Sequence, residues 1–183
     1  MNTESSPTAS DIVAFWREAG PARWFAKDEA FDRLFRERFL VAHETAAAGQ
    51  LTHWLGEADS ALALVLLLDQ FPRNAFRDTP RMYATDVQAR DAAHTMLASG
   101  LDQRVHVGLR LFCYLPFSHA ENLAEQELAV RLQTPLGAEY LRHAEGHRDI
   151  IRRFGRFPHR NRILGRATTT AEQAFLDEGG FRG

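Results

Sequence analysis

Residues 61–68 read ALALVLLL, eight apolar residues in a row, and this run limits the fold more than any other feature of the chain. A helix built from it has no polar face to turn toward water, so other elements must cover it on every side. Ser60 opens the segment and Pro72 is expected to stop it, which predicts a central buried helix over residues 60–71. The run is too short to cross a membrane, which takes about 20 apolar residues.

The rest of the chain carries repeated helix signals and no convincing strand. Apolar residues recur at helical spacing, N-cap residues such as Asp28 precede these stretches, and glycine follows them, as at Gly155. SHAE at 118–121 and TAEQ at 170–173 have the form of capping boxes. Further helices are predicted over about 9–19, 29–48, 81–98, 106–115, 119–133 and 137–154, with a short last helix beginning near residue 170. The prediction is an all-α fold of eight or nine helices, arranged as stacked antiparallel hairpins or as an irregular bundle.

Length and composition suggest one ordinary globular domain. The chain has 183 residues, of which 45% are hydrophobic and 25% charged. We expect residues 1–8 to be disordered and residues 9–183 to form a single domain. The polar, acidic N-terminus does not resemble a signal peptide, which predicts a cytoplasmic protein. Cys113 is the single cysteine, so one chain can form neither a disulfide nor a cysteine-rich zinc site, and its apolar neighbours predict a buried, inert thiol.

Positive charge is concentrated in one segment. Lys27 is the only lysine, and residues 142–166 hold eight arginines against Glu145 and Asp149, although the whole chain has a net charge of −2. This arginine-rich segment therefore needs partners elsewhere in the fold, in a ligand or in water.

Asp69 is the first candidate for chemistry, because it follows the apolar run near the C-terminal end of its helix. A negative charge there opposes the helix dipole, and a buried carboxylate must find a partner or take up a proton. Arg73, four residues on, is the expected partner, and the arginines of residues 152–166 are alternatives. Two interpretations stay open, namely a structural ion pair that fixes the next turn and a carboxylate that faces a ligand.

Two similar turns follow helices in different parts of the chain, FPRN at 71–74 and FPHRN at 157–161. In each, Phe-Pro precedes basic residues and asparagine. Arginine presents a planar fork of donors that suits carboxylate or phosphate, and asparagine both donates and accepts. The turns could face each other across a pocket, or both could serve only as helix stops with structural hydrogen bonds.

Histidines and glutamates also raise the question of a metal site. His143 and His147 are four residues apart, but HAEGH lacks the glutamate that follows the first histidine in zinc proteases. Glu121 and Glu125 lie at the same spacing near His119, but Glu121 already has a role in the predicted capping box. His147 otherwise lies on an apolar stripe of its helix and is expected to be a core residue or a ligand contact. No metal and no cofactor is expected.

Several long motifs, in the same order, resemble a widespread family of uncharacterised proteins, the domain-of-unknown-function family 924. They are DIVAFW, GPARWFAKDEAFD, LLLDQFPRNAFRDTPRMYATD, FCYLPFSHAENLAEQE, HRDIIRRFGRFPHRNRILGR and EQAFLDEGGF, and the resemblance covers residues 11–182. It implies a tetratricopeptide-like superhelix of packed helical hairpins, and it brings no established activity, substrate or cofactor.

Three functions fit these features. The first is binding of a small anionic ligand, with or without chemistry on it; the second is a protein-interaction scaffold, the usual work of superhelical hairpins. The third, RNA or DNA binding through residues 142–166, is disfavoured by the negative net charge and the single lysine. We assign Arg152, Arg153 and Arg156 to structure and solvation. We expect one pocket for a carboxylate or phosphate, with the candidate residues Asp69, Arg73, Asn74, His119, His147, His159, Arg160 and Asn161.

Overall fold

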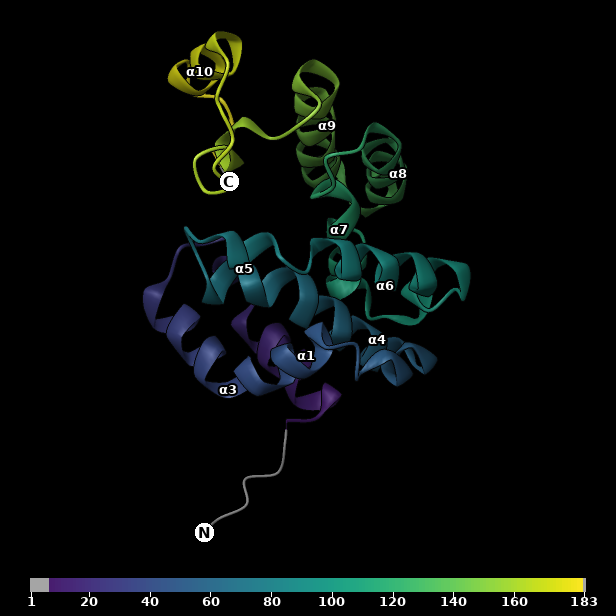
Figure 1. Cartoon of the computed structure of the whole chain (residues 1–183). Coiled ribbons are helices and arrows are strands. Elements are labelled where there is room, and N and C mark those ends of the chain that lie inside the picture. Colours follow the sequence, from purple (N-terminus) through teal and green to yellow (C-terminus); the bar gives the residue numbers. More distant parts are fainter. Residues whose placement is uncertain (1–6, 183) are drawn as a thin grey trace. The chain divides into compact units, whose positions relative to one another are not determined.

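The computed structural model describes residues 7–182, which are mainly helical and contain no β-strand, so the all-α prediction is confirmed (Figure 1). The chain divides into two compact units. Unit 1 holds the residues up to 77 together with 81–116, and unit 2 holds 78–80 and the residues from 117 onward. The tetratricopeptide-like arrangement and the single domain over 9–183 stay predictions. The predicted disordered segment 1–8 falls mainly on residues outside the described range, while Thr8 caps the first helix.

The α-helices of unit 1 are α1 (Ala9–Ala19), α2 (Pro21–Trp24), α3 (Glu29–Ala47), α4 (Ala58–Val65), α5 (Phe71–Ala75) and α6 (Asp86–Ala98). After α7 (Leu115–Ser118), unit 2 contains α8 (Leu123–Gln133), α9 (Ala138–Phe154) and α10 (Thr170–Asp177). Short 3₁₀ helices cover Thr52–Gly56, Pro80–Tyr83, Asp102–Arg104, Val107–Cys113, Thr134–Leu136 and Pro158–Arg160.

α4 lies at the centre of unit 1, as its sequence predicts. Every residue from 61 to 70 is buried, and α4 contacts both α1 and α6. An aromatic cluster fills the space beside it: the Trp16 ring of α1 lies 5.4 Å from Phe35 of α3 and 5.3 Å from Phe112. Cys113 is buried next to this cluster, as predicted, and burial raises the pKa of its thiol to about 12.

The helical path does not stop at Pro72, contrary to the prediction. A π-helical turn over Leu66–Gln70 joins α4 to α5, and Pro72 lies inside α5. Proline cannot donate to the carbonyl four residues before it, here that of Leu68. The Thr85 hydroxyl donates to that carbonyl instead at 2.6 Å, and His43 Nδ1 donates to the neighbouring Leu67 carbonyl at 2.8 Å. Side chains from distant positions therefore satisfy the backbone groups that the proline and the wide turn leave open.

The structure also corrects predicted helix limits around α6 and α7. The helix predicted over 81–98 begins at Asp86, and the predicted helix over 106–115 is a 3₁₀ helix from Val107 to Cys113. Pro116 lies within α7 rather than ending a helix. Proline is tolerated in a first turn, where its missing N–H has no helical partner, so its position alone does not mark a stop.

In unit 2, α8 and α9 are the principal packed pair, with a short connection between them (Figure 1). α8 begins at Leu123 with Asn122 as its N-cap, so the predicted SHAE capping box is wrong. α9 ends as predicted at Gly155, whose φ of 71° is left-handed. A capping box opens α10, but its members are Thr169 and Glu172, one residue earlier than predicted.

Candidate functional site

Asp69 and Arg73 contact each other in unit 1, as predicted from their spacing. Arg73 Nη1 lies 3.2 Å from Asp69 Oδ1, and the two terminal nitrogens of Arg73 donate to the Asp86 carboxylate at 2.8 and 3.0 Å. Gln70 Nε2 donates to Asp69 Oδ2 at 2.6 Å. Burial would lower the pKa of Arg73, but Asp69 and Asp86 raise it above its ordinary value. Arg73 is therefore a cation already paired within unit 1.

Asn74 is also occupied by protein partners. Its Nδ2 donates to Asp32 Oδ1 at 2.7 Å, and Arg77 donates to both oxygens of the same carboxylate, at 2.5 Å through Nε and 3.0 Å through Nη2. The FPRN turn thus provides structural hydrogen bonds between α3 and α5. This agrees with the structural interpretation of that turn.

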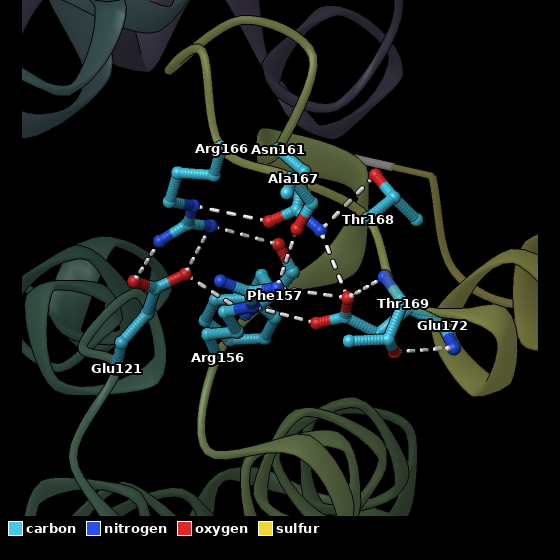
Figure 2. Close-up of polar contacts among 9 residues, drawn as sticks. All are labelled: Glu121, Arg156, Phe157, Asn161, Arg166, Ala167, Thr168, Thr169 and Glu172. Carbon is cyan, nitrogen blue, oxygen red and sulfur yellow. Dashed lines mark hydrogen bonds and ion pairs between the residues drawn. The ribbon is translucent and has the colours of Figure 1, made fainter.

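Unit 2 contains a second polar network, around Glu172, which Figure 2 shows. The buried Glu172 carboxylate accepts from Arg156 at 2.6 and 2.9 Å, from the Thr169 N–H at 2.7 Å and from Asn161 Nδ2 at 3.3 Å. The bond from Arg156 is the main reason that the pKa of Glu172 falls to about 2. Asn161 is fully buried, and its Oδ1 accepts from Arg166 Nε at 3.0 Å.

Glu121 extends this network to the segment before α8 (Figure 2). Its two oxygens accept from Arg166 at 2.6 and 2.9 Å, and Oε1 also accepts from the Phe157 N–H at 2.8 Å. Burial works to raise the pKa of Glu121, but the bonds from Arg166 and Phe157 lower it overall. Glu121 therefore bonds to the loop after α9. Because its carboxylate is occupied there, it does not cap α8.

Two histidines of unit 2 pack around the same aromatic rings. The Phe181 ring lies 4.6 Å from His147 and 5.1 Å from His159, and Phe157 lies 5.5 Å from each. The Arg160 guanidinium covers the Phe157 ring at 4.7 Å and donates to the His119 carbonyl at 2.9 Å. The structure therefore brings His119, His147, His159 and Arg160 into one neighbourhood, and their role as ligand contacts stays a prediction.

Both imidazoles are held in the neutral form. Burial lowers the pKa of His147 to about 4, and burial together with the Arg160 charge lowers that of His159 to about 3. His147 Nδ1 lies 2.7 Å from the His143 carbonyl oxygen. Because a carbonyl can only accept, Nδ1 carries the proton and Nε2 keeps a lone pair. His159 Nδ1 is buried without a hydrogen-bond partner among residues 7–182.

A pocket of about 370 Å³ lies beside His147 in unit 2. One wall is a stripe of α9, and phenylalanines of α10 and of the C-terminal segment form the other. The lining residues are Arg142, His143, Gly146, His147, Asp149, Ile150, Arg153, Phe154, Phe175 and Phe181. The volume is near the lower end of the range typical of small-molecule sites, about 300–1,000 Å³.

The arginines of residues 142–166 differ in whether they pair with a carboxylate of the protein. Five of its arginines pair with carboxylates of unit 2, namely Arg148 with Asp149, Arg152 with Glu127, Arg156 with Glu172, Arg162 with Asp78 and Arg166 with Glu121. Within the part of the chain that the structure describes, Arg142 and Arg153 form no ion pair, and both line the pocket. The Arg153 guanidinium lies over the rings of Phe154, at 4.7 Å, and Phe175, at 5.8 Å.

Sequence reasoning found only part of this site. His147 lines the pocket and His159 packs against Phe181, whereas Asp69, Arg73 and Asn74 belong to unit 1, so a shared pocket with Arg160 stays a prediction. Arg153, assigned from the sequence to structure and solvation, lines the pocket.

Three pocket residues of α9 were not selected from the sequence, although their spacing along the helix indicates a shared face. Arg142, Gly146 and Arg153 follow helical spacing i, i+4 and i+11, which places them on one face. No local pattern could have placed Phe175 and Phe181 opposite that face, because they come from another helix and from the segment after it.

Metal sites and membrane-spanning helices require features that residues 7–182 do not show. No group of three or more histidine, cysteine, aspartate or glutamate side chains in residues 7–182 is arranged to hold a metal ion. None of the helices in that range has the length and apolar character needed to cross a membrane.

Comparison with known proteins identifies relatives. The family model described as "Bacterial protein of unknown function (DUF924)" matches residues 12–180. The solved structure of a protein of unknown function from Agrobacterium tumefaciens is 58% identical in sequence, with a TM-score of 0.92 over 93% of this chain and 97% of that one. Among curated proteins, none matches this chain. A family model that covers nearly the whole chain, together with this close structural relative, shows that the chain belongs to the DUF924 family.

Proposed function

We propose that this protein binds a small anionic ligand, a carboxylate or phosphate attached to an apolar body, in the pocket of unit 2. One observation carries the proposal. Arg142 and Arg153 are arginines of the segment 142–166 that form no ion pair within residues 7–182, and both line a pocket whose other walls are mainly aromatic and aliphatic. Arginine suits this role because its planar fork donates two parallel hydrogen bonds to a carboxylate or phosphate.

The electrostatics of the lining support an anion rather than a cation. Asp149 is the one carboxylate of the lining, and it already bonds Arg148 and Arg152. His143 and His147 add no negative charge. A negative group that enters the pocket therefore meets two arginines and no free acid of the lining.

Nucleic-acid binding needs the arginines of residues 142–166 to be available for phosphates. Five of the eight are already paired with carboxylates, which weakens that hypothesis. A small ligand needs only Arg142 and Arg153, so small-ligand binding accounts better for this distribution of partners.

Isothermal titration calorimetry of the full chain with 2-naphthoate and its uncharged amide tests the proposal. At about 0.3–0.5 kcal/mol per non-hydrogen atom, 2-naphthoate should bind with a Kd between about 10 µM and 1 mM. The amide should bind at least about tenfold more weakly, because it cannot pair with a guanidinium.

Variants assign the binding to this pocket. Arg142→Gln and Arg153→Gln should each weaken 2-naphthoate binding, whereas Arg131→Gln, an exposed arginine of α8 that does not line the pocket, should not. Equal binding of the acid and the amide, or equal effects of all three variants, would refute the proposed function.

A further inference from the structure

We infer that the ligand of this pocket is a planar aromatic carboxylate, with one face of its ring against the α9 backbone at Gly146. This inference rests on the proposed function and adds the shape of the ligand body. Three independent features of the lining support it: the glycine in the middle of the α9 wall, the aromatic character of the other walls, and the placement of Arg153.

Gly146 is the first feature. It lies in the interior of α9, where glycine is less favourable than alanine. A Cβ placed on it would have no heavy atom within 4 Å, and its φ is outside the left-handed region. No packing contact or backbone conformation among the described residues therefore requires glycine here. What glycine provides is bare backbone and open space at the wall of the pocket.

The remaining walls are rich in flat rings. Phe154 and Phe175 lie 5.2 Å apart, and the Phe181 ring lies against His147 at 4.6 Å. Aromatic rings gain offset-stacked or edge-to-face contacts with another ring, beyond the area that they bury. A saturated ring of the same size is thicker and offers no π face, so it gains less from this lining.

Arg153 places the carboxylate relative to those rings. Its guanidinium lies over Phe154 and Phe175, and because these rings are only 5.2 Å apart, both lie on the same side of it, while its N–H groups point outward along the edge of its own plane. A carboxylate that pairs with this edge lies beside the phenylalanine rings. In an aromatic acid the carboxylate is conjugated with the ring, so the two form one flat unit suited to the space between Gly146 and the phenylalanines.

The test compares two acids of equal charge and carbon count, 2-naphthoate and trans-decahydro-2-naphthoate, by calorimetry on the full chain. The planar acid should bind about tenfold tighter. Equal binding, or tighter binding of the saturated acid, overturns the inference and leaves the proposed function in place. Failure of both acids to bind refutes both.

Gly146→Ala tests the position of the ring. The added methyl group should weaken 2-naphthoate binding about tenfold by occupying its space. Since alanine is the better helix former, the melting temperature should stay the same or rise, which separates lost binding from lost folding. Gly56→Ala is the matched control, because Gly56 also has open space and no left-handed φ but lies in unit 1. Unchanged affinity in Gly146→Ala overturns the inference.

Discussion

Replacing Glu121 by glutamine tests whether the loop after α9 is held by an ion-pair network. Glutamine keeps the shape and one acceptor but removes the charge that accepts two bonds from Arg166 and one from the Phe157 N–H. Hydrogen bonds to charged groups contribute about 1 kcal/mol more than neutral ones, or about 3 kcal/mol for three bonds. The Arg166 and Glu121 side chains are 23% and 25% exposed, so water offsets part of this loss. We expect Glu121→Gln to lower the free energy of unfolding by about 2 kcal/mol, equivalent to about 4–8 °C in melting temperature.

A double-mutant cycle followed by urea unfolding and circular dichroism identifies the partner. Glu121→Gln and Arg166→Gln should be non-additive by about 1 kcal/mol, as expected for residues in direct contact. Glu121→Gln and Ser118→Ala should be additive, since the Ser118 hydroxyl accepts from Gln133 rather than capping α8. Coupling to Ser118 with none to Arg166 would show that the SHAE capping box forms after all and would refute the network.

Three further predictions concern the buried parts of each unit. Leu66→Ala, at a fully buried position of the π turn, should cost about 2–5 kcal/mol in urea unfolding, and a loss below about 1 kcal/mol would place this turn outside the core. Asp69→Ala should lower the free energy of unfolding by about 2–3 kcal/mol. This loss is smaller than that for breaking a whole buried ion pair, because Arg73 still pairs with Asp86. The loss should disappear when Arg73 is first replaced by methionine. The pKa of His147 is about 4 in the folded state and about 6.5 in the unfolded chain, so the unfolded chain takes up the proton first as the pH falls. The contribution of His147 to the free energy of unfolding is therefore complete above pH 6.5. It is lost as the pH falls toward about 4, by up to about 3 kcal/mol. His147→Gln should reduce the dependence of thermal stability on pH over that window, with the contribution of His159 remaining, and an unchanged profile would contradict the assignment.

The candidate site was only partly visible in the sequence. The excess of arginine over acid in residues 142–166 indicated that most of these arginines need partners other than Glu145 and Asp149, in the fold, in a ligand or in water. Which arginines would find them depended on carboxylates far along the chain, such as Glu121 for Arg166 and Asp78 for Arg162. Arg153 therefore looked like an ordinary helix-end charge, and only its position beside Phe175 made it a candidate for binding.

Local sequence determined the elements whose signals act within one turn of helix. Asp28 caps α3 because its side chain reaches the N–H groups of residues two and three positions later, and Gly155 ends α9 because glycine takes the left-handed conformation at low cost. The apolar run of α4 likewise required burial, whatever surrounds it. Tertiary structure decided the elements for which a local signal competed with a distant partner. Pro72 does not stop its helix because Thr85 satisfies the open carbonyl, and Glu121 leaves its predicted cap because a charged bidentate bond to Arg166 is stronger than a capping bond.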